Sequence, residues 1–464
     1  MTLSSTTNRI PLMRSAFRLV ALLILAGWAS SADAQTALHT LISPDVQPYG
    51  RFGESIASAG DVDGDGVPDI VVGAPSEGED RPGQAHVFSG ATGAALATLT
   101  SDEPQKRGDF GIGVAGSANG TRGVRVIVTA PRESAGDRAP QGGNLYLYEG
   151  ASGSVEDDTD SPNESPNGRF GFSIESSPDA DEDGIDDVVV GAPSEVVSDE
   201  PATTGRVYVL SGEDGDDLAE LEPPQEGVRL FGFSAAGLPD VNGDGVPDVV
   251  VGAVGTSTSS QPRFAGVVYV YSGEDERFLL SVSSPNGVED GRFGSAVAHV
   301  GDTNGDGISD FVVGAPGERT GAGNEAGRAY LFSGSNGSLL HTLDSPTGQS
   351  SGRFGESVTG SVDVNGDGTP DVLVGAPSEA SSAGRVHAFS GADGSFLATL
   401  QSPRDAINGG FGTSLSIIND LDGDGTHDVL VGATGESAPD GTERAGAAYV
   451  FSGAPLVTGA VAGE

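Results

Sequence analysis

The sequence predicts an all-β fold, a seven-bladed β-propeller made of four-stranded antiparallel blades. Three observations predict it. The chain repeats itself at intervals of roughly 57 to 62 residues, and such a period is typical of one supersecondary unit stacked many times. Each repeat holds four short runs rich in Val, Ile and Tyr, bounded by turn-forming residues. A further strand-like segment, residues 37–44, precedes the first complete repeat.

A Phe-Gly pair marks the start of each repeat. It recurs at Phe52, Phe110, Phe170, Phe231, Phe293, Phe354 and Phe411. A fixed marker at this spacing identifies seven copies of the repeat. Length alone, at 464 residues, would suggest about three domains, but the number of repeats is the better guide to the architecture.

Four predicted strands follow each Phe-Gly pair. The first is a short alternating stretch such as residues 55–59, and the second is an apolar run such as Ile70–Val72, which ends in Gly-Ala-Pro. The third is a run such as Gly205–Gly212, and the fourth is Leu-rich and precedes Ser-Pro. Second strands such as Val188–Val190 are apolar at consecutive positions, which is typical of a strand buried on both faces.

Residues 37–44 match residues 340–346 without a blade of their own. We therefore expect this N-terminal strand to complete the last blade and close the ring. An open solenoid is the alternative, but it would leave the strand unexplained and would require polar capping repeats.

The first residues predict export. Arg9, Arg14 and Arg18 precede the apolar run Leu19–Trp28, and Ala32-Asp33-Ala34 forms a small-residue cleavage site, as in a secretory signal peptide. We predict a signal peptide at 1–34 and a propeller at 35–464. A membrane anchor is disfavoured because the apolar run is well short of the roughly 20 residues that span a bilayer. The expected location is secreted, cell-surface or periplasmic.

Composition limits the chemistry. Cysteine is absent, so disulfides cannot stabilise an exported chain, and bound metal ions are the obvious substitute. The formal net charge is -44, which excludes nucleic-acid binding. A saline habitat and plain solubility both remain open as reasons for the acidity.

Asp-rich loops follow the first predicted strand of six repeats. In Asp61-Val62-Asp63-Gly64-Asp65-Gly66-Val67-Pro68-Asp69, carboxylates at positions 1, 3, 5 and 9 and the carbonyl at position 7 suit a hard cation. The predicted ligands are Asp61, Asp63, Asp65, Val67 and Asp69; Asp179, Asp181, Asp183, Ile185 and Asp187; Asp240, Asn242, Asp244, Val246 and Asp248; Asp302, Asn304, Asp306, Ile308 and Asp310; Asp363, Asn365, Asp367, Thr369 and Asp371; and Asp420, Asp422, Asp424, Thr426 and Asp428.

These ligands predict about six Ca²⁺ ions. Zn²⁺ would favour His or Cys, Mg²⁺ usually keeps its waters, and an EF-hand would place Glu at position 12, where Val72 stands. Glu182 replaces the glycine of the third loop, so that loop has the least certain geometry. The second repeat has residues 117–122 in place of the carboxylates, and we expect no metal there. Asp-Gly hairpin turns without metal are the alternative.

The combination of Phe-Gly, the Asp-rich loop and Gly-Ala-Pro resembles the FG-GAP repeats of the integrin α-subunit propeller. Gly-Ala-Pro is intact at Gly73, Gly191, Gly314 and Gly375 and drifts elsewhere. The resemblance implies a seven-bladed propeller with Ca²⁺ in inter-strand loops and a loop face that binds partners. The leg domains, transmembrane helix and cytoplasmic tail of integrins are not found in this sequence.

No catalytic motif stands out, and we predict no enzymatic activity. The histidines, including His86 and His387 at matching repeat positions, are interpreted as packing residues. Arg107-Gly108-Asp109 matches the tripeptide that integrins recognise, but it lies where other repeats have Gly-Arg-Phe-Gly, and we interpret it as coincidence.

The favoured function is an exported, Ca²⁺-binding adhesion or extracellular binding module with a protein or glycan ligand. One alternative is an extracellular enzyme or carbohydrate-binding accessory protein, because similar propellers accompany phospholipase and polysaccharide-cleaving domains. A structural surface-coat protein is another.

Overall fold

The computed structural model describes residues 37–117, 124–134, 139–150, 153–163, 165–196, 204–256 and 262–453. All of them belong to one unit, Gln35–Glu464. The predicted signal peptide at 1–34 lies outside the described residues.

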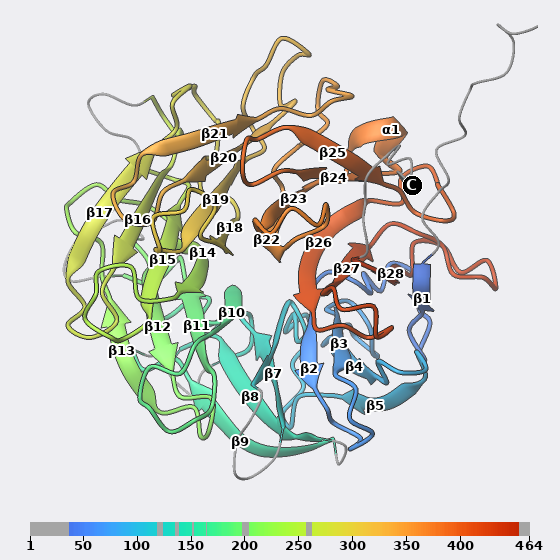
Figure 1. Ribbon diagram of the computed structural model, residues 1–464. Coiled ribbons are helices and arrows are strands. Elements are labelled where there is room, and N and C mark those ends of the chain that lie inside the picture. The colour runs from blue at the N-terminus through green and yellow to red at the C-terminus, as the bar shows by residue number, and fades with distance from the viewer. Residues whose placement is uncertain are drawn as a thin grey trace, which may run out of the picture. The chain divides into compact units, whose positions relative to one another are not determined.

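Seven four-stranded antiparallel sheets are arranged as blades around a central opening (Figure 1). Blade 1 contains β2 (Ile56–Gly60), β3 (Asp69–Ala74), β4 (Gln84–Phe88) and β5 (Ala95–Leu99). Blade 2 contains β6 (Gly113–Ser117), β7 (Arg125–Ala130), β8 (Asn144–Glu149) and β9 (Ser154–Asp160). Blade 3 contains β10 (Ser173–Ser177), β11 (Asp187–Ala192), β12 (Arg206–Leu210) and β13 (Asp217–Leu221).

Blades 4 to 6 continue this order. Blade 4 contains β14 (Phe231–Leu238), β15 (Asp248–Ala253), β16 (Val267–Tyr271) and β17 (Phe278–Ser283). Blade 5 contains β18 (Val297–Gly301), β19 (Asp310–Ala315), β20 (Arg328–Phe332) and β21 (Leu339–Leu343). Blade 6 contains β22 (Val358–Val362), β23 (Asp371–Ala376), the short α1 (Glu379–Ser382), β24 (Arg385–Phe389) and β25 (Phe396–Leu400).

Blade 7 closes the ring. Its strands are β26 (Phe411–Ile418), β27 (Asp428–Ala433), β28 (Ala447–Phe451) and the N-terminal β1 (Ala37–Leu41). β1 pairs antiparallel with β28, with Leu41 opposite Ala448, and Figure 1 shows the blue N-terminal strand beside the red C-terminal ones. The prediction of a closed propeller with an N-terminal closing strand is confirmed, and the open solenoid is wrong.

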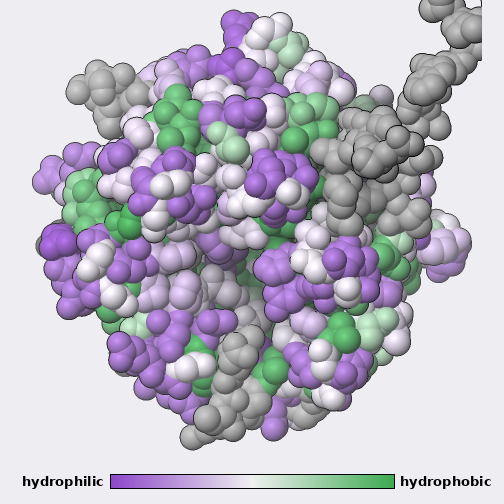
Figure 2. All heavy atoms as spheres, in the orientation of Figure 1, coloured by the Kyte–Doolittle hydropathy of each residue, from purple (hydrophilic) through white to green (hydrophobic). Residues whose placement is uncertain are grey.

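The hydrophobic core lies between neighbouring blades. Every residue of the second strand is buried in all seven blades, as the consecutive apolar positions predict. One cluster joins Val71 and Val87 of blade 1 to Val126 and Tyr146 of blade 2. Each blade therefore buries its faces against two others, while hydrophilic residues dominate the outer surface seen in Figure 2.

The Phe-Gly pair joins one blade to the preceding one. Phe52 is fully buried, and its ring centroid lies 5.7 Å from that of Phe88 in an edge-to-face arrangement. Its backbone N–H donates to Ala445 O of blade 7 at 3.0 Å. Gly53 has a φ of +85°, and a Cβ there would lie 2.5 Å from Ala447 O, so only glycine fits.

Serine hydroxyls tie five blades to the Phe-Gly glycine of the next blade, whereas Ser295 of blade 5 donates to Arg292 O instead, at 2.8 Å. The donor and acceptor pairs are Ser55 to Gly111 (3.0 Å), Ser173 to Gly232 (3.2 Å), Ser234 to Gly294 (2.9 Å), Ser357 to Gly412 (2.8 Å) and Ser414 to Gly53 (2.9 Å). In blade 2, Gly113 stands at the serine position, and Thr129 donates to Gly171 O instead, at 2.8 Å. Blade 2 thus has glycine where the other blades have serine, and Thr129 where they have the glycine of Gly-Ala-Pro. These two replacements compensate each other.

A buried glutamate follows the Gly-Ala-Pro turn in six blades. These residues are Glu77, Glu133, Glu195, Glu318, Glu379 and Glu436, and all are fully buried. Glu133 Oε2 accepts from Tyr146 Oη at 2.6 Å and from Ser101 Oγ of the preceding blade at 3.1 Å. His86 replaces the tyrosine in blade 1, with Nε2 2.8 Å from Glu77. The repeat position of His86 is thus a hydrogen-bonded core position, which supports its interpretation as a packing residue.

Candidate metal centre

The six Asp-rich loops all lie on one face of the ring. Each connects the first and second strands of its blade, whereas Phe-Gly precedes or begins the first strand and Gly-Ala-Pro lies at the end of the second. Because these strands are antiparallel, the loops lie at the opposite end of each blade from those motifs. We call the two surfaces the loop face and the Phe-Gly face.

Positions 1, 3 and 9 come together in the three loops that carry aspartate at all of them. One carboxylate oxygen from each residue lies within 4.8 Å of the others. The groups are Asp61, Asp63 and Asp69; Asp179, Asp181 and Asp187; and Asp420, Asp422 and Asp428.

The other three loops have asparagine at position 3, and its amide contacts the position-9 carboxylate. Asn242 Nδ2 donates to Asp248 Oδ1 at 3.0 Å, and the same bond joins Asn304 to Asp310 at 3.1 Å. Asn365 and Asp371 are joined at 3.2 Å. Positions 3 and 9 therefore meet in all six loops.

The position-1 carboxylate organises the turn. Asp61 Oδ1 accepts from the backbone N–H groups of Gly64 at 2.8 Å and Asp65 at 3.0 Å, and Oδ2 accepts from Gly66 at 2.9 Å. In the last loop, hydrogen bonds from the loop backbone, that of Gly425 above all, hold the pKa of Asp420 below its usual range. Asp420 is thus kept as a charged acceptor.

The position-9 carboxylates are fully buried. Asp69 Oδ2 accepts from Val62 N at 2.8 Å, and Oδ1 accepts from Gly90 N at 2.9 Å. Burial raises the pKa of all six, to about 6 for Asp187 and Asp248 and to about 7 for Asp371. A buried carboxylate without a cation is costly, and a divalent ion would supply the missing charge.

Positions 5 and 7 are linked to each other. The position-5 carboxylate accepts the backbone N–H of position 7, and the position-7 residues are Val67 (2.8 Å), Ile185 (2.7 Å), Val246 (3.0 Å), Ile308 (2.9 Å), Thr369 (2.8 Å) and Thr426 (2.8 Å). In blades 4, 5 and 7 a serine hydroxyl also donates to position 5, as from Ser272 to Asp244 at 2.9 Å. Position 5 does not belong to the groups formed by positions 1, 3 and 9.

This donor set fits Ca²⁺. It offers only carboxylate, amide and carbonyl oxygens, whereas Zn²⁺ favours nitrogen and sulfur ligands. Several oxygens are already held in place by backbone N–H groups, which limits the ordering that ion binding would require.

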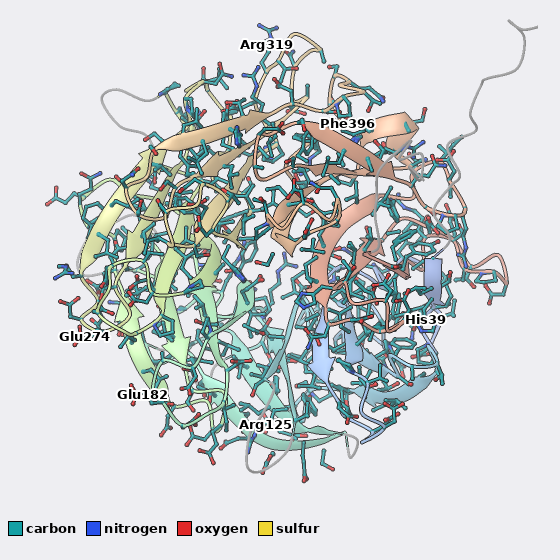
Figure 3. All side chains as sticks on the ribbon, in the orientation of Figure 1. His39, Arg125, Glu182, Glu274, Arg319 and Phe396 are labelled. Atoms are coloured by element: carbon teal, nitrogen blue, oxygen red, sulfur yellow. The ribbon has the colours of Figure 1, made fainter. Side chains whose placement is uncertain are left out.

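The third loop, which has Glu182 at position 4, differs from the other loops, as its sequence suggests. Glu182 has a φ of +64° where Gly243 of the next blade has +85°, a conformation that is unfavourable for a residue with a side chain. In five loops the N–H of position 4 donates to the position-1 carboxylate, and no such bond is found from Glu182 in the described residues. Figure 3 shows Glu182 at the rim of the ring.

Blade 2 has a cation of its own at the position of the buried aspartate. Each second strand begins at position 9 of its loop, and β7 begins at Arg125. Arg125 is 3% exposed, and its Nη1 lies 3.2 Å from Glu156 Oε2 (Figure 3). The prediction that blade 2 binds no metal falls on residues 118–122, outside the described residues, but Arg125 at position 9 is unsuited to a cation. Aligning the repeats by their second strands would have revealed it.

Comparison with known protein families agrees with these motifs. The family model described as FG-GAP repeat matches residues 52–88, 170–210, 231–271, 293–332, 354–389 and 411–451. The matched segments cover half of the chain. This chain belongs to the FG-GAP repeat family. The FG-GAP model does not match the second repeat, yet that repeat forms blade 2 with four strands.

Curated relatives place this FG-GAP propeller among integrin-α-like proteins. It is 32% identical to integrin alpha-5 of Xenopus laevis over 45% of this chain and 20% of that protein. It is 35% identical to integrin alpha-3 of Cricetulus griseus over 41% of this chain and 18% of that protein. Integrin alpha pat-2 of Caenorhabditis elegans is 29% identical over 59% of this chain and 24% of that protein. The chain therefore spans about a fifth of the length of these relatives.

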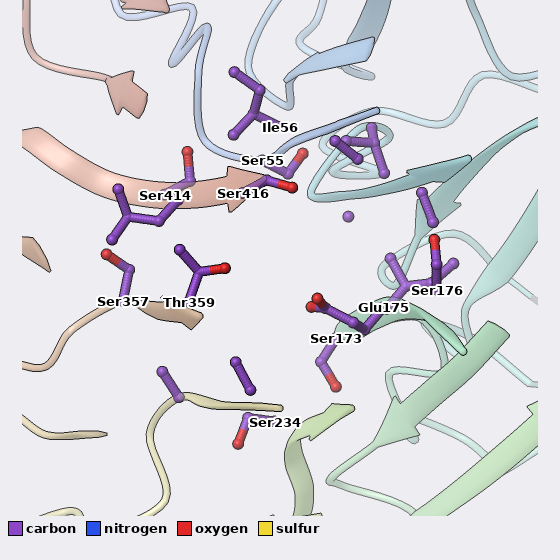
Figure 4. Close-up of a pocket in the computed structure, with 18 of the residues that line it drawn as sticks. Ser55, Ile56, Ser173, Glu175, Ser176, Ser234, Ser357, Thr359, Ser414 and Ser416 are labelled. Atoms are coloured by element: carbon purple, nitrogen blue, oxygen red, sulfur yellow. The ribbon is translucent and has the colours of Figure 1, made fainter. Parts of the chain in front are cut away.

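The central opening of the FG-GAP ring is a cavity of about 510 Å³. Serine and threonine hydroxyls surround it in Figure 4, and the Glu175 carboxylate lies among them. The Glu175 side chain is exposed to the opening, and its enclosure by the surrounding ring raises its pKa to about 7. No helix among the described residues is long and apolar enough to span a bilayer.

Proposed function

We propose that this protein is an exported binding module for adhesion or other extracellular contact, stabilised by about six Ca²⁺ ions in the loop-face sites. The observation that carries the proposal is the recurrence of the Asp-rich loop in six blades of an integrin-α-like propeller, with positions 3 and 9 close together in every loop. Residues 1–34 would direct export and be removed, and the function would be non-enzymatic.

The role of Ca²⁺ would be structural. Three of the loops bring three carboxylates together, and a cation bound only by the folded chain stabilises that chain by mass action. In a chain without cysteines, six such sites would replace disulfides as cross-links between strands.

Calorimetric titration of Ca²⁺ into metal-stripped protein tests the proposal. We expect a stoichiometry near six and a rise in melting temperature. Asp61→Asn, at the position that is aspartate in all six loops, should lower the stoichiometry by one. Asp157→Asn, on the exposed outer strand of blade 2, removes the same charge and should leave it unchanged. Binding of one ion or none would overturn the proposal.

Two further measurements test export and adhesion. The N-terminus of the exported protein should be Gln35. Arrays of glycans and of extracellular matrix proteins should give a specific ligand, and binding to neither would favour a structural surface-coat protein.

A further inference from the structure

A second candidate site lies on the Phe-Gly face, at the junction of blades 1, 2 and 3. It is a pocket of about 320 Å³ lined by Arg51, Arg132 and Arg169 together with Glu54, Asp109 and Phe172. Ligand pockets commonly measure about 300 to 1,000 Å³, so this one can hold one sugar-sized group. It is separate from the Asp-rich loops, which lie at the opposite ends of the blades.

The gathering of three arginines is unusual in this chain. The whole sequence has 23 lysines and arginines against 67 aspartates and glutamates. Three of these few basic side chains meet in one pocket, and all three guanidinium groups act on the half-buried Asp109 carboxylate. The pocket is therefore a local positive region on an acidic protein.

Two carboxylates lie beneath the guanidinium groups. Arg51 pairs with Glu54, and Arg132 Nη1 lies 3.1 Å from Asp109 Oδ2. In both pairs the arginine side chain is 44% exposed and the acid 17%. The guanidinium groups are thus open to solvent, where a ligand would bind, and the two carboxylates hold them in place.

Arg169 has no ion-pair partner within the described part of the chain, so its charge is the one most available to a ligand. Beside it, Phe172 is half-buried and packs on Phe233 with ring centroids 5.1 Å apart. Ile112 and Pro131 complete an apolar wall.

The combination of arginines, carboxylates and an apolar wall in this pocket favours some classes of anion over others. A phosphate or sulfate needs donors on every side, and Glu54 and Asp109 would repel it. A hydroxy acid suits both halves of the pocket, because its carboxylate can pair with guanidinium groups while its hydroxyls donate to the two acids. An aromatic wall suits the apolar face of a sugar ring.

We propose that this pocket binds a uronate residue of an acidic polysaccharide, with Arg169 and Arg132 on the carboxylate and Phe172 against the ring. The inference rests on the proposed function as an extracellular binding module and names a ligand class for it. The Arg107-Gly108-Asp109 tripeptide contributes Asp109 to the floor of this pocket, paired with Arg132, so it does not present a free carboxylate.

Titration calorimetry with trigalacturonate as the probe, at fixed Ca²⁺ with a protein-free blank, tests the inference. We expect the unmodified protein to bind it and not to bind the fully methyl-esterified trisaccharide. Arg169→Gln should weaken binding about tenfold or more, as loss of a charge-assisted hydrogen bond implies. Arg277→Gln removes the same charge from an exposed site of blade 4 and should have no effect.

Several outcomes would overturn the inference: no binding of trigalacturonate, equal binding of the ester, or equal losses in the two variants. Ca²⁺ stoichiometry and melting temperature, measured on the same samples, separate this failure from failure of the proposed function. If six ions bind but trigalacturonate does not, only the pocket inference falls.

Discussion

Arg125 Nη1 lies 3.2 Å from Glu156 Oε2, at the point in blade 2 where the six metal-type blades begin their second strand with a buried aspartate. The arginine brings its own positive charge, whereas the aspartates require one from solution. Blade 2 therefore stabilises this end of β7 with the positive charge of its own arginine side chain.

This contrast predicts a difference in Ca²⁺ dependence. Arg125→Met should lower the melting temperature by a similar amount in Ca²⁺ and in chelator, because no ion is involved. Asp69→Asn should lower it mainly in Ca²⁺, since without the ion the variant also loses an uncompensated buried carboxylate. Thermal unfolding of both variants in both conditions checks this. Equal behaviour of the two variants would contradict it.

The hydroxyl that ties blade 2 to blade 3 gives a second prediction. Thr129→Val keeps the shape of the side chain and removes the donor to Gly171 O, and it should cost about 1 kcal/mol of unfolding free energy. Chemical denaturation measures it. Thr342→Val, at an exposed position of the outer strand β21, makes the same chemical change and should leave the unfolding free energy nearly unchanged.

The compensation within blade 2 can be tested by a double-mutant cycle. A Cβ on Gly113 would lie 2.7 Å from Thr129 Oγ1 and 2.6 Å from Ile174 Cγ2, so Gly113→Ser should destabilise the protein. Adding Thr129→Gly removes the first clash and restores the arrangement of the other blades. The double variant should be more stable than the sum of the single effects predicts. Additive effects would show that the two positions are independent.

Glu182→Gly should stabilise the third loop. The residue sits at a φ of +64°, where a side chain costs about 1 to 2 kcal/mol that glycine avoids. We expect a higher melting temperature, reduced somewhat by the greater freedom of glycine in the unfolded chain. Glu226→Gly, an exposed position outside the left-handed region, should not stabilise the protein. A lower melting temperature for Glu182→Gly would contradict the prediction.

The buried Glu133 predicts a pH dependence. Burial raises its pKa above the ordinary value of 4.5, although Tyr146, Ser101 and Gln105 partly offset this by hydrogen bonding. A carboxyl with a raised folded pKa adds stability at pH below its unfolded pKa and loses it as pH rises through the folded pKa.

Wild type should therefore gain stability relative to Glu133→Gln as pH falls from neutral towards 4.5. Denaturation in chelator over this range isolates the effect from Ca²⁺ binding. Glu226→Gln, at an exposed position that is not among the groups acting on Glu133, serves as the control and should not show this gain. If wild type instead loses stability relative to Glu133→Gln as pH falls, the assignment of a raised pKa to Glu133 is refuted.

The sequence by itself determined the repeat, the closed seven-bladed ring and the six Asp-rich loops. It could do so because each depends on residues close together in one repeat: apolar runs form buried strands, and carboxylates at fixed spacing within nine residues meet in one turn. The spare strand at residues 37–44 also required a partner, and β28 is that partner.

Only the tertiary structure decided what lies between blades. The buried glutamates such as Glu133 recur at a fixed position, but their partners come from the preceding blade and from the third strand. Two other contacts also join residues from different repeats. Thr129 of blade 2 donates to Gly171 of blade 3 in place of the usual serine, and one pocket brings together Arg51, Arg132 and Arg169. Sequence distance carries no information about such contacts, because closure of the ring sets which side chains face each other.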